Sequence, residues 1–124
     1  MHITTDEIQP MVFGDYEGRT ADLGDWRVAW ETLPAGFPPD PSLFKGLPDN
    51  RCQCVHLGVV VTGSFKVTYL DGSEEIVSEG QSYRLDPGHF VQATEQTEVI
   101  EFSPREEHER TTQQILKNMG AMSA

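Results

Sequence analysis

One stretch near the middle of the chain, residues 51–63, decides the fold; it reads RCQCVHLGVVVTG. It is the most β-prone run in the sequence and predicts a strand over 52–61, followed by a turn at Gly63. Cys52, Cys54 and His56 occupy alternate positions. Because side chains alternate between the two faces of a strand, all three are expected on one face. Thiolates and imidazoles are common ligands of zinc, copper and iron, so this face is a candidate site inside a β-structure.

Beyond Gly63, short β-prone segments follow one another up to residue 102. The expected strands cover 65–70, 75–77, 82–85, 90–94 and 97–102. Asp71-Gly72 is a strong signal for a tight hairpin turn. Short strands about ten residues apart, joined by glycine turns, predict an all-β sandwich or barrel.

On the N-terminal side, residues 26–32 alternate well and predict a half-buried strand, with Trp26, Val28 and Trp30 on its apolar face. Residues 1–25 are expected to be irregular apart from a short strand at 11–13. Residues 33–50 hold five of the eight prolines and several large apolar residues. This proline-rich arm is expected to lie across a sheet face or across a partner subunit.

The C-terminal residues predict a helix over about 104–119. Ser103-Pro104-Arg105-Glu106 has the pattern of a capping box, with Ser103 as the N-cap and Pro104 at the first helical position. Gly120 is a natural stop. A narrow apolar stripe predicts that the helix docks on the barrel or on a second subunit. His108 is assigned to its polar face.

Composition limits the class of protein. A chain of 124 residues is expected to form a single domain over 1–124, with its barrel core at about 26–102. A net charge of −11 argues against binding to nucleic acid or anionic membranes. No apolar run is long enough to span a membrane and the first residues lack signal-peptide features, so a cytoplasmic location is expected. Two cysteines one residue apart are expected to stay reduced.

Residues 50–102 resemble the cupin superfamily of small β-barrels, in particular small single-domain bacterial cupins. In the first cupin motif, two histidines and a glutamate precede a glycine. Here Gly63 is that glycine, His56 stands at the glutamate position, and Cys52 and Asn50 stand at the histidine positions. In the second motif Val91 stands where the histidine is usual. The matching framework residues are Gly63, Asp71-Gly72, Gly80 and Pro87-Gly88, and His89 directly follows the last of them.

The resemblance implies an all-β cupin fold, a double-stranded β-helix or jelly-roll barrel with a C-terminal α-helix, and an atypical ligand set. Cupins include dioxygenases, isomerases, decarboxylases, lyases, epimerases, storage proteins and sensory domains. The fold therefore does not settle the function, nor whether the chain is an enzyme.

The first functional hypothesis is a divalent transition-metal site built from Cys52, His56 and His89, with Cys54 as a further candidate ligand. His89 shares the strand parity of Val91 and can face the interior. Residues four apart on a straight strand are too distant to share an ion, so a bulge or bend is needed. Zinc suits mixed sulfur and nitrogen ligands best; iron, copper and nickel are the alternatives. Such a site would support metal-dependent chemistry on a small organic substrate.

The second hypothesis is a metal-free barrel, either a ligand-binding or sensory module or a metal-independent isomerase or cyclase. Aromatic side chains would line its pocket, with Tyr69, Tyr83 and Trp30 as candidate substrate-binding residues. A homodimer is expected in both cases, because the proline-rich arm and the helix offer apolar contact surface. No paired-carboxylate site is predicted from the sequence.

Overall fold

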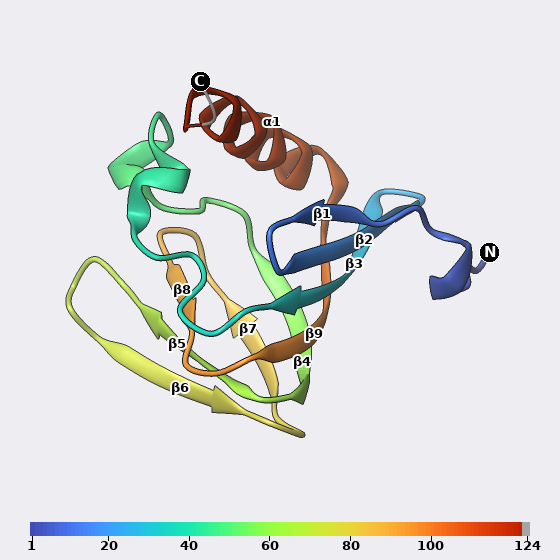
Figure 1. Ribbon diagram of the computed structural model, residues 1–124, viewed down its shortest axis with the longest axis horizontal. Coiled ribbons are helices and arrows are strands. Elements are labelled where there is room, and N and C mark those ends of the chain that lie inside the picture. Colours follow the sequence, from blue (N-terminus) through green and yellow to red (C-terminus); the bar gives the residue numbers. More distant parts are fainter. Residues whose placement is uncertain (123–124) are drawn as a thin grey trace.

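The computed structural model describes residues 1–122 and is built mainly of antiparallel strands (Figure 1). Six strands form one sheet in the order β1-β2-β3-β9-β4-β7, and three form a second sheet in the order β6-β5-β8. The strands are β1 (Met11–Phe13), β2 (Tyr16–Leu23), β3 (Trp26–Leu33), β4 (His56–Thr62), β5 (Ser64–Thr68), β6 (Glu74–Ser78), β7 (Ser82–Leu85), β8 (Phe90–Ala93) and β9 (Thr97–Pro104). The predicted all-β jelly roll is confirmed.

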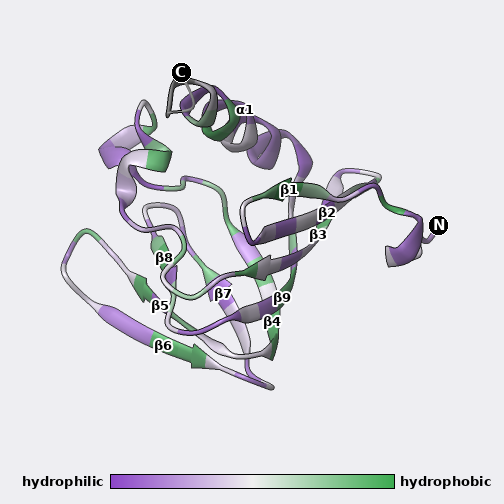
Figure 2. Ribbon diagram, in the orientation of Figure 1, coloured by the Kyte–Doolittle hydropathy of each residue, from purple (hydrophilic) through white to green (hydrophobic). Residues whose placement is uncertain are grey.

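The hydrophobic core lies between the two sheets. Its buried members are Val60, Phe65, Val67, Val77, Tyr83, Leu85 and Val99, which come from strands of both sheets. Figure 2 shows hydrophobic residues distributed over both sheets, whereas the helix is mostly hydrophilic. Packing of the two inner faces closes the barrel around this core and leaves room for a cavity at one end.

Gly63 forms the junction at which the chain passes from β4 in the larger sheet to β5 in the smaller one. Its φ is +84°, which favours glycine, and a Cβ atom there would lie 2.6 Å from Thr97 Oγ1. The Thr97 hydroxyl accepts a hydrogen bond from the backbone N–H of Ser64 at 3.1 Å. The turn is therefore fixed both by conformation and by close contact.

The prediction that residues 1–25 are largely irregular is wrong for Tyr16–Leu23, which forms β2. Phe13 pairs with Tyr16 and Leu23 pairs with Trp26, so Gly14-Asp15 and Gly24-Asp25 are two-residue hairpin loops. Only the glycine has positive φ in each loop, +58° at Gly14 and +63° at Gly24, as in type II′ turns. The repeated Gly-Asp pair was the signal that could have predicted the hairpins.

The proline-rich arm contains two short 3-10 helices, Pro41–Phe44 and Pro48–Asn50, and packs on its own barrel. The backbone N–H of Gly36 donates to Ala93 O, and the N–H of Ala93 donates to Phe37 O, at 2.8 and 2.9 Å. These bonds place the start of the arm beside the end of β8. The arm thus covers the end of the barrel where the cavity lies.

The helix α1 (Arg105–Met122) lies across that same end of the barrel (Figure 1). The predicted helix is present, but two details differ. Ser103 belongs to β9 and its hydroxyl contacts His56, so it is not the N-cap; the helix also passes through Gly120. The Asn118 amide donates to the carbonyls of Leu43 and Lys45, which joins α1 to the arm. Within residues 1–122, no helix is long and apolar enough to cross a membrane.

Candidate metal centre and cavity

The polypeptide between the arm and β4 bends and brings Cys52 beside His89. The N–H of Cys52 donates to His89 O at 3.2 Å, and the N–H of Gly88 donates to Cys52 O at 2.8 Å, forming an isolated antiparallel bridge. The chain bends at Cys54 and enters β4 at His56. The expectation of one continuous strand over 52–61 is therefore wrong, but the bend that a shared ion would require is present.

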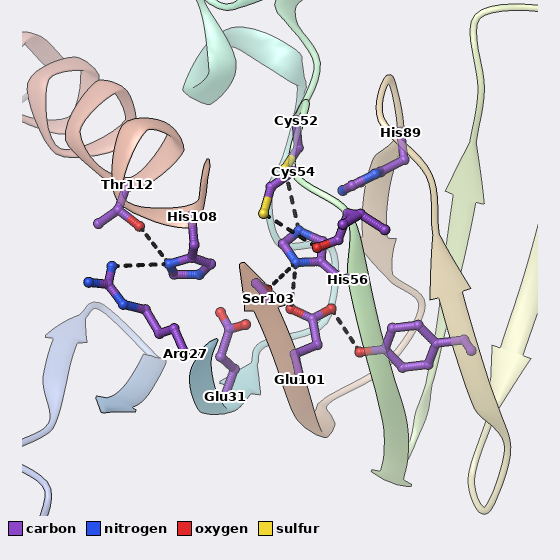
Figure 3. Close-up of polar contacts among 12 residues, drawn as sticks. Arg27, Glu31, Cys52, Cys54, His56, His89, Glu101, Ser103, His108 and Thr112 are labelled. Atoms are coloured by element: carbon purple, nitrogen blue, oxygen red, sulfur yellow. Dashed lines mark hydrogen bonds and ion pairs between the residues drawn. The ribbon is translucent and has the colours of Figure 1, made fainter. Parts of the chain in front are cut away.

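The side chains of Cys52, His56 and His89 converge and are buried (Figure 3). One potential ligand atom from each lies within 4.8 Å of the other two. The Sγ of Cys52 is 3.4 Å from His56 Nε2, and the two imidazole rings have centroids 5.1 Å apart. We call these three residues the Cys–His–His cluster. Cys52 and His89 come from the isolated bridge that joins them, and His56 is the first residue of β4.

Hydrogen bonds fix the orientation of both imidazoles. His89 Nδ1 lies 2.6 Å from Asp86 O, and a carbonyl can only accept, so Nδ1 carries the proton and Nε2 keeps its lone pair. His56 Nδ1 lies 2.6 Å from Ser103 Oγ and 3.7 Å from Glu101 Oε2. Partners of this kind on the far nitrogen are typical of metal-binding histidines.

Burial makes the cluster uncharged at neutral pH. It lowers the pKa of His56 and His89 to about 4, with the proximity of His56 adding to the effect at His89. It raises the pKa of the Cys52 thiol to about 12. Neutral imidazoles are the form that binds metals, whereas the thiol must lose its proton to do so.

Cys54 is fully buried but lies outside the cluster. Its Sγ is 3.4 Å from Val55 O, and burial raises the pKa of this thiol to about 12. Both cysteines are free thiols.

The cluster lines a cavity of about 520 Å³ at the end of the barrel beneath α1 and the arm. Most of its wall is apolar and comes from β3, the arm, α1 and the barrel strands. A volume of this size suits a small organic molecule. Of the aromatic residues predicted to bind substrate, Tyr83 lines the cavity, whereas Tyr69 and Trp30 do not.

Those two residues have other environments. Tyr69 packs beside the core, and its hydroxyl accepts a hydrogen bond from the N–H of Asp86 at 3.4 Å. Trp30 pairs across the sheet with Arg19 and Ile100, between Ala29 and Glu31, which both line the cavity. Because faces alternate, Trp30 points to the outer face of the sheet.

A pair of carboxyl groups, Glu31 and Glu101, faces the cavity and was missed by sequence reasoning. The two residues lie on neighbouring strands β3 and β9, and their carboxyl groups are hydrogen-bonded to each other. The Tyr16 hydroxyl donates to Glu31 Oε2 at 2.7 Å, and the Tyr83 hydroxyl donates to Glu101 Oε1 at 2.8 Å. Burial raises the pKa of both carboxyls, and the negative charge of Glu101 raises that of Glu31 further.

His108 of α1 also lines the cavity, so its assignment to a polar, solvated helix face is wrong. Its ring centroid is 6.2 Å from that of His56. Burial lowers the pKa of His108 to about 4. Arg27 of β3 donates to His108 Nδ1 at 3.3 Å and to Glu109 Oε2 at 2.6 Å. No sequence signal links these positions, because β3 and α1 meet only in the folded chain.

The donor set fits a transition-metal ion. It offers one sulfur and two imidazole nitrogens, the Nε2 of His89 is free of a proton, and the group is shielded from bulk solvent. Three protein ligands beside a cavity leave a coordination position for water or substrate, as catalytic sites require.

The sequence matches no family model and no curated protein. Solved structures do resemble it. An RmlC-like cupin from Shewanella frigidimarina is 14% identical with a TM-score of 0.58, over 82% of this chain and 88% of that one. Ectoine synthase from P. lautus is 13% identical with a TM-score of 0.60, over 84% and 77% of the two chains.

Oxalate decarboxylase from Bacillus subtilis, a protein with Mn(II) centres, is 14% identical with a TM-score of 0.59. The match covers 82% of this chain but 28% of that one, so this chain spans less than a third of its length. At such low identity the likeness concerns the fold. Together with the two-sheet jelly roll and the glycine turns at Gly63, Gly80 and Gly88, it shows that the chain has the fold of these cupins.

Proposed function

We propose that the protein is a metal-dependent cupin that binds one transition-metal ion on the Cys–His–His cluster and acts on a small organic molecule in the adjoining cavity. One observation carries the proposal. Three buried side chains of metal-binding type converge within 4.8 Å at the wall of a cavity of about 520 Å³. A buried group of this kind is a more specific signal than any of its residues alone.

Zinc is the ion that the mixed sulfur and nitrogen donors favour, with iron, copper and nickel as alternatives. Bound there, the ion would act as a Lewis acid toward a substrate oxygen. Ser103 and the carbonyl of Asp86 hold His56 and His89 in place through their Nδ1 atoms. The three side chains of the cluster are buried, and α1 and the arm supply part of the cavity wall beside them.

The Glu31–Glu101 pair supports an enzymatic role over a purely sensory one. It lines the same cavity, and a carboxyl pair that shares hydrogen bonds can hold or release a proton beside a substrate. Tyr16 and Tyr83 orient the two carboxyls. Structural cores rarely contain two adjacent buried carboxyl groups, because their desolvation is unfavourable.

We also propose a homodimer formed through the outer face of the six-stranded sheet. Trp26, Leu57 and Phe102 are 47%, 45% and 42% exposed on this face. Arg19 on the same face is paired with Glu17 at 3.2 Å. Two copies of a chain with a net charge of −11 repel each other least where they meet at apolar, charge-balanced surfaces.

Elemental analysis tests the metal proposal. Purified without chelators and reconstituted with zinc, the wild-type protein is expected to bind about one ion per chain. Cys52→Ala and His89→Ala are expected to lose at least about tenfold in zinc affinity, because each removes a ligand.

Cys54→Ala is the matched control, since Cys54 is an equally buried thiol two residues from Cys52. It is expected to keep wild-type zinc affinity. Wild-type protein that binds no zinc, iron, copper or nickel would overturn the proposal and leave the metal-free barrel. Loss of zinc from the Cys54→Ala variant alone would contradict the assigned ligand set.

A further inference from the structure

We propose that His108 is a substrate-binding residue whose Nε2–H donates a hydrogen bond to a carbonyl or carboxylate oxygen of the molecule bound in the cavity. The inference deepens the proposed function, because it names the chemistry of the ligand. It rests on that function only in taking the Cys–His–His cluster beside the ligand to be a metal site. It stands on the contacts of His108 itself.

Arg27 determines which nitrogen of His108 carries the proton. A guanidinium group has only N–H donors and stays protonated, so the contact of 3.3 Å between Arg27 Nη1 and His108 Nδ1 requires Nδ1 to be the acceptor. The Thr112 hydroxyl lies 3.3 Å from the same Nδ1 and can also donate to it. In a neutral imidazole the proton must then reside on Nε2.

The guanidinium is itself held firmly. Arg27 Nε donates to Asp22 Oδ1 at 2.7 Å, Nη1 donates to Glu109 Oε2 at 2.6 Å, and the side chain is only 12% exposed. These two carboxylates are the charged groups that face Arg27 from β2 and α1. They offset its charge, so Arg27 fixes the imidazole without presenting an unpaired positive charge to the cavity.

The Nε2–H of His108 is left for a ligand. The two nitrogens of an imidazole point in nearly opposite directions, and the His108 contacts among the described residues are those of Nδ1 and the ring contact with His56. His108 lines the cavity, and its ring centroid is 6.2 Å from that of His56 (Figure 3). His108 is half-buried at the cavity wall, so its Nε2–H can donate to an acceptor oxygen of a molecule bound there.

The polar groups around the cavity define the ligand. His108 supplies a donor from the side of α1, and the Cys–His–His cluster lies next to it. The Glu31–Glu101 pair faces the cavity from the sheet and offers carboxyl oxygens as acceptors. A small molecule with a carbonyl or carboxylate oxygen toward His108 and a hydroxyl or amine toward the glutamates satisfies all of them.

The tautomer is tested first, in metal-free protein, so that the result does not depend on the metal proposal. Two-bond ¹H–¹⁵N correlation spectra distinguish Nδ1–H, Nε2–H and the imidazolium ion. His108 is expected as neutral Nε2–H at pH 7. An Nδ1–H tautomer or a charged ring at that pH would overturn the inference.

Binding is tested with two isosteric probes, acetate for a carboxylate and acetamide for a neutral carbonyl, titrated into the protein and followed by NMR shifts. The side-chain amide nitrogen of Gln can occupy the position of the histidine Nε2, whereas that of Asn can occupy the position of Nδ1. His108→Asn is expected to lower the affinity for the more tightly bound probe about 5-fold. His108→Gln is expected to keep an affinity within about twofold of that of wild type.

The probe that binds more tightly identifies the class of the acceptor. Equal binding by His108→Asn and wild type, or no shift of the His108 resonances with either probe, would refute the role of His108. Failure of the metal proposal is seen separately, as absence of metal with intact probe binding.

Discussion

The residues of the candidate site are ordinary in type and unusual in environment. Cys52, His56 and His89 are each nearly inaccessible to solvent, and burial keeps all three uncharged at neutral pH. A neutral set avoids the large desolvation penalty of buried charge. The free energy of metal binding would then include the release of the Cys52 proton, which makes occupancy more favourable as pH rises.

Glu31 provides a prediction at this scale. Its folded pKa is raised above the ordinary value of 4.5, mainly by burial and then by the charge of Glu101. A raised carboxyl pKa means that the folded state holds its proton more tightly than the unfolded chain. The stability that this provides is complete below pH 4.5 and is lost as pH rises through the folded pKa.

Glu31→Gln removes this dependence and keeps a partner for both Tyr16 and Glu101. We therefore expect the unfolding free energy of the variant, relative to that of wild type, to increase by roughly 1–3 kcal/mol from pH 5 to pH 8. Urea unfolding of metal-free protein at both pH values measures the gain. Glu75→Gln, at an exposed position of β6, should show almost no such change. A stability difference between Glu31→Gln and wild type that stays the same or falls from pH 5 to pH 8 would contradict the prediction.

At the level of elements, local signals predicted the barrel strands well. The Asp71-Gly72 turn and the alternation around it correspond to β5 and β6, and residues 82–85 form β7 as expected. β2 was missed because polar residues and Gly18 interrupt its alternation. Ser103 was misread because its hydroxyl bonds to His56, a contact formed only when β4 and β9 pair. A local sequence pattern cannot show whether a serine hydroxyl caps a helix or bonds to a distant side chain.

The sequence predicted the Cys–His–His cluster but not the other polar residues of the cavity. Parity and the cupin resemblance placed Cys52, His56 and His89 together in the interior, although a bend rather than a straight strand achieves it. Glu31 and Glu101 could not be paired from the sequence, because only the β3–β9 register, in which Ala29 pairs with Glu101 and Glu31 with Val99, makes them diagonal neighbours. His108 likewise could not be identified as a site residue from the sequence, because it reaches the cavity only when α1 packs over the barrel.

The junction at Gly63 gives a prediction for the elements. Gly63 and Gly72 have nearly equal positive φ, +84° and +87°, so alanine suffers similar backbone strain at both. They differ in space: a Cβ at Gly63 would clash with Gln96 O and Thr97, whereas the space at Gly72 is open. Gly72→Ala should cost about 1–2 kcal/mol of unfolding free energy. Gly63→Ala should cost about 1–3 kcal/mol more.

Denaturant unfolding of the two variants measures this difference. Equal destabilisation would show that the contacts of Gly63 with the start of β9 do not constrain the passage between the two sheets. A larger effect at Gly72 would place the constraint in the β5–β6 hairpin instead.

For the whole molecule, the two faces of the six-stranded sheet differ in their side chains and surroundings. Its inner face carries Ala29, Glu31 and Glu101 and lines the cavity. Its outer face carries Trp26 and Trp30 on β3, with Leu57 and Phe102 directly opposite each other on β4 and β9. Residues of α1 and the arm line the cavity at the inner face, whereas Trp26, Leu57 and Phe102 on the outer face stay exposed in residues 1–122.

This asymmetry leads to a prediction about assembly. If two copies meet at the outer face, Leu57→Glu brings two like charges into an apolar contact and should convert the dimer to a monomer. Ile76→Glu is the matched control, because Ile76 is an aliphatic residue 55% exposed on β6 of the other sheet and the change in charge is the same. Light scattering at micromolar concentration is expected to show dimers for wild type and Ile76→Glu and monomers for Leu57→Glu. Wild-type monomers, or a dimer that survives Leu57→Glu but not Ile76→Glu, would assign the outer face no role in assembly.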